Sequence, residues 1–171
     1  MKKTLLISVV AAALMAFTYG EWYSYSSQKY HFSANFPGKP TETSQQDTIS
    51  PGVYVTSFMA EYSVSDNEVY MASYTDLGSS FPKDKTMQQM LENSRDGAAG
   101  AMNAADVTTL ATNTGGSTPY IEFKFSAQGL TGKDRIYIIG RCQYCMIAIF
   151  SADKGIVSDA DKFIRSFKYV K

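Results

Sequence analysis

Two neighbouring segments near the C-terminus, residues 135–139 (RIYII) and 144–150 (YCMIAIF), are apolar at almost every position. β-Branched and aromatic residues dominate both segments, which favours strands over helices. A strand that is apolar on both faces needs cover on both sides, so it belongs inside a sheet. A glycine at position 140 favours a turn between the two segments. We therefore predict a central hairpin with a further layer on each side of the sheet.

Other segments carry strand patterns on either side of a helical stretch. Residues 52–62 and 69–77 are rich in Val, Tyr and Thr and flank a turn-like SVSDNE, which predicts a hairpin. Residues 120–127 alternate cleanly, which predicts a half-exposed strand with Glu122 and Lys124 on its polar side. Shorter strand candidates are residues 21–27, 30–36 and 106–112, and residues 41–50 are expected to be a loop or an edge strand.

The sequence changes to a helical period at residues 83–105. Asp84 is the expected cap of this helix. Residues 158–167 predict a short final helix, with Ser158 or Asp159 as its cap. These elements together predict an α+β fold, a mainly antiparallel sheet covered by helices. The apolar stripe of the long helix comprises Met87, Met90, Leu91, Ser94, Ala98, Ala101, Met102 and Ala105.

The N-terminal stretch has the layout of a secretory signal peptide. Lys2 and Lys3 precede an uncharged apolar run, and small residues stand at positions 18 and 20. The apolar run is short for a membrane span, which needs about 20 residues, although an uncleaved anchor is the alternative. We therefore expect residues 1–20 to be removed, residues 21–171 to form one domain, and no stable membrane anchor to remain.

The charge balance narrows the classes of partner. The chain has 16 basic and 16 acidic residues, so it lacks the basic excess typical of proteins that bind nucleic acid or anionic membranes. The expected partner is a protein, with a small ligand or a glycan as the alternative. An exported protein is expected in the periplasm or outside the cell.

The two cysteines, Cys142 and Cys145, form a CxxC pair that runs from the turn into the start of the second apolar segment. Thioredoxin-like chemistry needs such a pair at a helix N-terminus, where the thiolate is stabilised, and this pair falls in a hairpin. In an oxidising compartment a structural disulfide is the favoured state. If the strand sends Cys145 into the core, however, the two thiols point apart and stay free.

Other catalytic and metal-binding patterns are absent from the sequence. His31 is the one histidine, so a zinc site lacks ligands and a Ser-His-Asp site has a single candidate base. No GxSxG, GxGxxG or Walker motif occurs. We expect no catalytic residues, no metal and no cofactor, although a pair of carboxylates acting as acid and base stays open.

Tyrosines supply a candidate binding surface. If Tyr54, Tyr62, Tyr70 and Tyr74 share one side of their hairpin, they form a ladder of rings suited to protein or glycan contacts. The alternative is that the long helix covers them and that they belong to the core.

The two ends of the mature chain carry a family resemblance. The segment FSANFPGKP at residues 32–40, preceded by Trp22, and the segment DKFIRSFKY at residues 161–169 resemble small secreted domains of the PsbP/Mog-like class. The resemblance is greatest to bacterial periplasmic DcrB-like proteins of unknown function. It implies an antiparallel sheet between helices and a non-catalytic binding or assembly role, and it says nothing about the CQYC pair.

The sequence thus predicts an exported, non-catalytic binding or accessory module of the cell envelope, more a binding protein than an enzyme. The alternative is a thiol–disulfide redox factor that uses Cys142 and Cys145.

Overall fold

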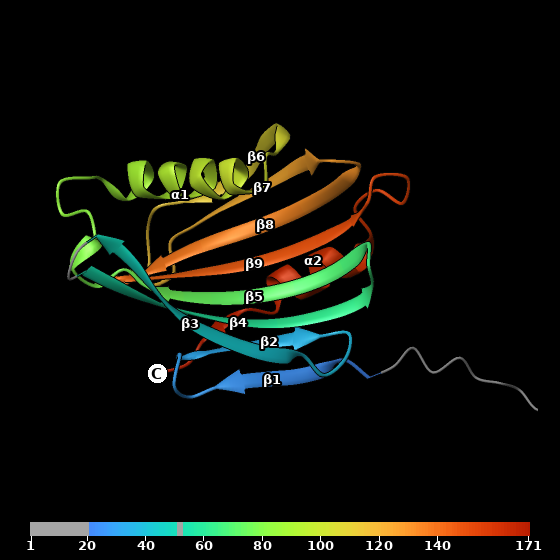
Figure 1. Ribbon diagram of the computed structural model, residues 1–171, viewed down its shortest axis with the longest axis horizontal. Coiled ribbons are helices and arrows are strands. Elements are labelled where there is room, and N and C mark those ends of the chain that lie inside the picture. Colours follow the sequence, from blue (N-terminus) through green and yellow to red (C-terminus); the bar gives the residue numbers. More distant parts are fainter. Residues whose placement is uncertain (1–20, 51–52) are drawn as a thin grey trace, which may run out of the picture.

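The computed structural model describes residues 21–50 and 53–171 (Figure 1). The expected signal peptide, residues 1–20, and the first residue of the 52–62 segment lie outside the described residues. The helices are η1 (Gly78–Ser80), α1 (Met87–Ala101) and α2 (Ser158–Arg165). The strands are β1 (Tyr23–Ser27), β2 (Phe32–Phe36), β3 (Thr41–Ser50), β4 (Val53–Ser65), β5 (Glu68–Asp76), β6 (Ala105–Asn113), β7 (Tyr120–Ala127), β8 (Leu130–Ile139), β9 (Cys142–Ser151) and β10 (Lys168–Tyr169).

Seven of these strands form one antiparallel sheet in the order β3-β4-β5-β9-β8-β7-β6. The sheet consists of two meanders, β3–β5 and β6–β9, joined where β5 pairs with β9. The segment that contains α1 carries the chain from β5 to the far edge at β6 (Figure 1). The apolar β8–β9 hairpin therefore lies inside the sheet, which confirms the expectation from its sequence.

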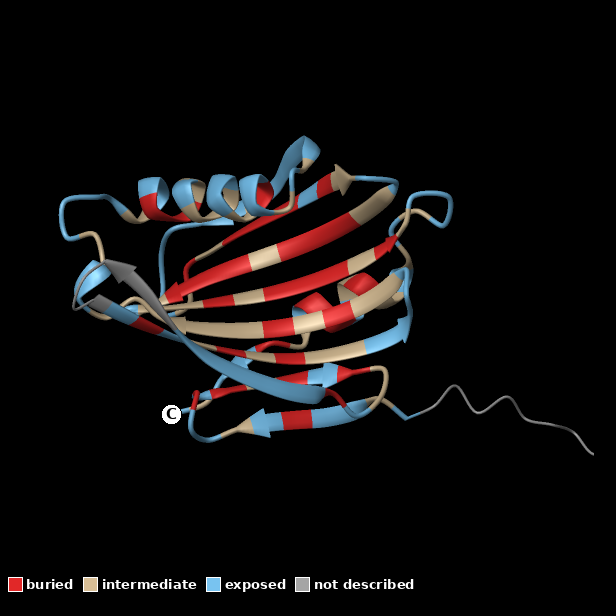
Figure 2. Ribbon diagram, viewed as in Figure 1, coloured by how far each residue is buried: buried red, intermediate tan, exposed pale blue. Residues whose placement is uncertain are grey.

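Each face of the large sheet packs against a different layer. On one side, here called the α2 face, α2 and the small β1-β2-β10 sheet enclose an aromatic core that includes Phe32, Tyr70 and Phe163. On the other side, the α1 face, Met90 and Leu91 of α1 cover an aliphatic and aromatic core. The buried positions of β8 and β9 in Figure 2 reflect this cover on both sides. The mainly antiparallel α+β architecture is as predicted.

Helix α1 begins at a capping box. The Thr86 hydroxyl accepts a hydrogen bond from the backbone N–H of Gln89, and the side-chain oxygen of Gln89 accepts one from the backbone N–H of Thr86. This pairing satisfies two backbone donors that the first turn otherwise leaves unpaired. The prediction that Asp84 caps this helix was therefore wrong, because Asp84 lies before the N-cap residue, Thr86. Helix α2 has no side-chain cap, because Val157 occupies its N-cap position and Ser158 and Asp159 lie within the first turn.

No helix in the described part of the chain is long and apolar enough to cross a membrane.

Candidate functional site

The two cysteines lie on β9 and are both free thiols. Because side chains alternate along a strand, residues three positions apart project to opposite faces. Cys142 packs against the core of the α2 face, and Cys145 against the core of the α1 face. Three strand residues also span about 10 Å, beyond the roughly 7 Å limit on Cα separation in a disulfide. The favoured disulfide was therefore wrong for this structure, which has the alternative arrangement of separated thiols.

The surroundings of the thiols disfavour thiolate formation at Cys145. Burial, reinforced by the negative charge of Asp134, raises the pKa of Cys145 to about 12. The Gln143 amide nitrogen lies 3.4 Å from its sulfur. Cys142 is half-buried, and its sulfur lies 3.5 Å from the Tyr74 hydroxyl. A thiol with a raised pKa holds little of the thiolate that attacks disulfides, so Cys145 is a poor partner for exchange.

The four candidate tyrosines come from β4 and β5 and share the α2 face, as their spacing predicts. Tyr62 pairs directly with Tyr70, and Tyr74 with Phe58. Their exposure differs widely: Tyr70 is 1% exposed and Tyr54 is 59% exposed, whereas Tyr62 and Tyr74 are half-buried. The rings therefore do not form one exposed ladder.

The cover over these tyrosines differs from the expected one. The ring of Phe163 on α2 lies 5.4 Å from that of Tyr70, and the ring of Tyr30, before β2, lies 4.9 Å from that of Tyr74. Helix α1 packs on the other side of the sheet, against β7 and β8. The long helix was thus the wrong cover: the final helix and the N-terminal hairpin take that place.

A different surface on β3, β4 and β5 is left open because α1 covers only the β7–β8 half of its face (Figure 1). Two rows of side chains cross these strands in register and continue onto β9. One row is Gln45, Ser57, Thr75 and Gln143, and the next is Thr43, Met59, Ser73 and Cys145. Strand alternation puts both rows on the α1 face. We call Thr43, Gln45, Ser57, Met59, Ser73, Thr75 and Gln143 the open polar face.

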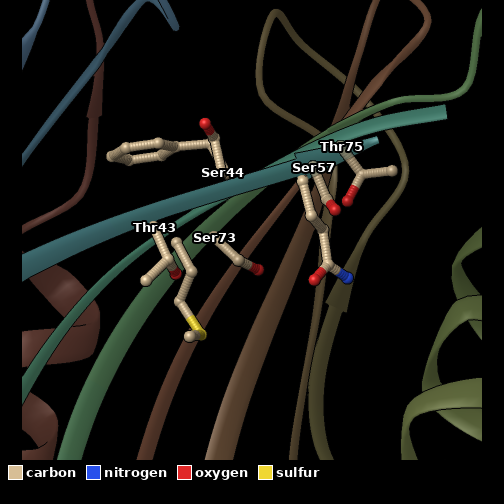
Figure 3. Close-up of a pocket in the computed structure, with 8 residues that line it drawn as sticks. Thr43, Ser44, Ser57, Ser73 and Thr75 are labelled. Carbon is tan, nitrogen blue, oxygen red and sulfur yellow. The ribbon is translucent and has the colours of Figure 1, made fainter. Parts of the chain in front are cut away.

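A hollow of about 220 Å³ lies on the open polar face. Figure 3 shows Thr43, Ser57, Ser73 and Thr75 around it, with Ser44 directed to the opposite side of β3. Its lining consists of hydroxyl, amide and apolar groups, and none of these side chains ionises near neutral pH. Such a surface offers hydrogen bonds to a partner and contains no acid or base suited to proton transfer.

A second hollow of about 240 Å³ lies between α1 and the η1 segment. Gln143 lines this hollow and pairs across the sheet with Thr75, which lines the first. The Ser94 hydroxyl on α1 lies 2.8 Å from the Gln143 side-chain oxygen, and this hydrogen bond connects α1 to the row of side chains that ends at Gln143. The open polar face therefore continues to the start of α1.

A buried ion network occupies the α2 face at β7 and β8. Lys133 lies 2.7 Å from Glu122 and 2.5 Å from Asp161 of α2, and Arg135 also binds Glu122. Burial opposes ionisation of Glu122, but hydrogen bonds from Lys133 and Arg135 lower its pKa below the ordinary value. Glu122 was expected on an exposed strand face and is instead buried. Because every charged group of the network has a partner of opposite charge, α2 can pack over β7 and β8 at this place.

Asp134 is a buried acid on the α1 face, in register between Phe123 and Ile147. Its Oδ1 atom has no hydrogen-bond partner among the described residues. Burial raises the pKa of Asp134 to about 8, despite a backbone hydrogen bond at Arg135 that acts in the other direction. This carboxyl is therefore mostly protonated at neutral pH. No cluster of three or more metal-ligating side chains forms within residues 21–50 and 53–171.

Neither the open polar face nor Asp134 was predicted from the sequence. A signal for the open polar face is present, since Ser57, Ser73 and Thr75 alternate with the aromatic residues of the opposite face. No comparable signal marks Asp134, because a single acid in an apolar strand also fits an exposed position.

No protein-family model and no curated protein match the sequence. Solved structures do match. The solution structure of cyanobacterial PsbP (CyanoP) from Synechocystis sp. PCC 6803 aligns with a TM-score of 0.55 at 11% identity, over 90% of this chain and 95% of that chain. A crystal structure from Bacteroides thetaiotaomicron VPI-5482 is 17% identical, with a TM-score of 0.41, over 90% of this chain and 49% of that chain.

The match with CyanoP establishes a PsbP-like α+β fold for this chain. It confirms the fold class that the sequence resemblance implied. At this level of identity the likeness concerns the fold alone, and the functional argument depends on the surfaces described above.

Proposed function

We propose that this chain is an exported, non-catalytic binding or accessory module of the cell envelope, and that it is related to DcrB-like periplasmic proteins. The observation that supports this most is the open polar face: one half of a sheet face is left without helical cover, and it is lined by hydroxyl and amide groups. An antiparallel sheet can leave part of a face open to solvent, and this uncovered half is therefore accessible to a partner. The partner we favour is a protein.

The chemistry of the lining supports binding over catalysis. The side chains around the first hollow can donate and accept hydrogen bonds, but they include no group that ionises near neutral pH. The thiol–disulfide alternative has weaker support, because Cys142 and Cys145 face opposite ways and the pKa of Cys145 is raised to about 12. Export is inferred from the signal-peptide layout of residues 1–20.

Site-specific photo-crosslinking in cells that naturally express the chain tests this proposal. A benzophenone amino acid replaces Thr75 on the open polar face, and a control chain carries it at Thr112, an exposed position on β6. We expect a discrete protein adduct from position 75 and none from position 112, and equal labelling from both positions would contradict the proposed binding surface. We also expect the recovered chain to begin at Glu21, and a chain that retains residues 1–20 would contradict the proposed export. An adduct with a small ligand or glycan in place of a protein would redirect it.

A further inference from the structure

The outer edge of β3 is a long and regular stretch of backbone at the border of the large sheet. Residues 41–48 pair with β4 without a shift in register, whereas β6, at the other border, contains two shifts. In an antiparallel edge strand alternate residues direct their N–H and C=O groups away from the sheet. Such an edge is a template for another strand unless something blocks it.

Residues 41–48 of β3 lack the usual blocking devices, and the register shift of this strand lies at its far end, between Thr48 and Ser50. Proteins protect sheet edges with lysines, prolines and bulges. Strand β3 has the sequence TETSQQDTIS, which contains no lysine, arginine or proline, and its flanking prolines, Pro40 and Pro51, lie outside its bounds. By contrast, the register shifts of β6 disrupt that edge. One edge is therefore blunted and the other is kept able to pair.

The segment from β3 to β5 carries charged residues of one sign only. No lysine or arginine occurs between Lys39 and Lys83, although the whole chain has equal numbers of acids and bases. Among the described side chains of this segment, Glu68 alone forms an ion pair, with Lys154 at 3.3 Å. Two copies of β3 would bring like charges together, which disfavours self-pairing. The acids of the segment are Glu42, Asp47, Glu61, Asp66, Glu68 and Asp76.

Hollows lie on both sides of β3 at the same place along the strand. The 220 Å³ hollow of the open polar face includes Thr43, and a third hollow of about 310 Å³ includes Glu42 and Tyr30 on the opposite side. Lys29 also lines this third hollow, and its ammonium lies over the Tyr30 ring, 5.0 Å from the ring centroid. Successive side chains of an added strand point to opposite sides, so both hollows can receive them.

We propose that the outer edge of β3 takes up an extended, lysine- or arginine-bearing segment of a partner protein as an additional strand of the sheet. This inference rests on the proposed binding function and names its surface and the chemistry of its partner. Backbone hydrogen bonds to β3 hold the segment, and its basic side chains lie against the acidic β3–β5 end of the sheet.

Binding of synthetic octapeptides to the full purified chain tests the proposal. The probe is KTKVKTKV, and the controls are ETEVETEV and KTKVKTKV with alternate D-residues, which keeps the charge but prevents a regular strand. By fluorescence anisotropy, we expect the all-L basic peptide to bind roughly tenfold tighter than either control. Amide exchange of residues 41–46 should slow in its presence, and exchange in β6 should not change.

Matched lysine variants locate the edge. Ser44→Lys with Gln46→Lys adds the natural blocking residue to β3, and Thr112→Lys adds it to the exposed β6 edge. We expect the β3 variant to lose roughly tenfold or more in affinity at an unchanged melting temperature, and the β6 variant to bind normally.

The proposal is overturned if the D-containing peptide binds as tightly as the all-L peptide, if amide exchange in β3 does not slow, or if the all-L basic peptide does not bind. If the Thr75 crosslink forms normally in the β3 variant, the edge proposal fails and the proposed function stands.

Discussion

Cys142 and Cys145 project from opposite faces of β9, one toward the Tyr74 hydroxyl and the other into the core beneath α1. This separation predicts two thiols that behave independently. Mild oxidation of the monomer should not produce the loss of about two mass units that marks an internal disulfide, because the Cα atoms lie too far apart. Alkylation should modify Cys142 before Cys145, and mass analysis of the proteolytic peptides measures this order. An internal disulfide in folded monomer would refute this geometry.

The buried carboxyl of Asp134 predicts an unusual pH dependence of stability. Its pKa rises from 3.8 to about 8 on folding, so the folded state binds the proton more tightly. The contribution to the free energy of unfolding is full below pH 3.8, falls as the pH rises, and is lost above a pH of about 8. The slope approaches about 1.4 kcal/mol per pH unit in that window.

Urea unfolding at several pH values between these limits measures the effect. The Asp134→Asn variant should lose this slope, while Asp153→Asn, at an exposed position, should keep it. Identical pH profiles for the Asp134 variant and the unmodified chain would show that the carboxyl is ionised in the folded state.

Helix α1 is held by residues on its buried side, and Leu91 is fully buried. Leu91→Ala should lower the free energy of unfolding by about 2–5 kcal/mol, through lost burial and the cavity left behind. Leu91→Asp should unfold the domain, because it places an unpaired charge against the sheet. Asn93→Asp, on the exposed side of the same helix, is the control and should have little effect. A normal melting temperature for Leu91→Asp would contradict the packing of α1.

The ion network predicts different costs for its two acids. Glu122→Gln leaves Lys133 and Arg135 buried with one partner fewer and should lower the free energy of unfolding by about 3–5 kcal/mol. Asp161→Asn should cost less than about 1 kcal/mol, since that side chain is 48% exposed and solvent screens its pair. Denaturant titration of both variants gives the comparison. Equal losses would show that burial does not set the strength of these pairs.

The sequence predicted the element types well, because strand alternation and helical periodicity are local properties. It also placed the β8–β9 hairpin inside the sheet. It did not reveal which layer covers which face: α2 covers the tyrosines and α1 lies on the other side, a choice made by contacts between distant segments. For the same reason Glu122 was expected to be exposed, since its burial depends on Lys133 and Arg135 in the next strand and Asp161 on α2.

The candidate sites were harder to predict than the fold. The CxxC pair and the tyrosines are conspicuous as residue types, but the pairing of Ser57 with Thr75 and of Thr75 with Gln143 exists only once β4, β5 and β9 are in register. A surface made of common polar residues has no motif in the sequence. Its position beside an uncovered sheet edge is what distinguishes it.

The central claim is that the open polar face, and not the cysteine pair, contacts the partner. The most direct measurement is the yield of the Thr75 photo-adduct in two further variants, after checking that both keep the melting temperature of the unmodified chain. Ser73→Trp fills the hollow beside Thr75, and Cys142→Ser with Cys145→Ala removes both thiols. We expect the tryptophan variant to lose the adduct and the variant without cysteines to keep it. The opposite result, an adduct that survives in the tryptophan variant and is lost when the cysteines are removed, would refute contact through the open polar face and favour the redox alternative.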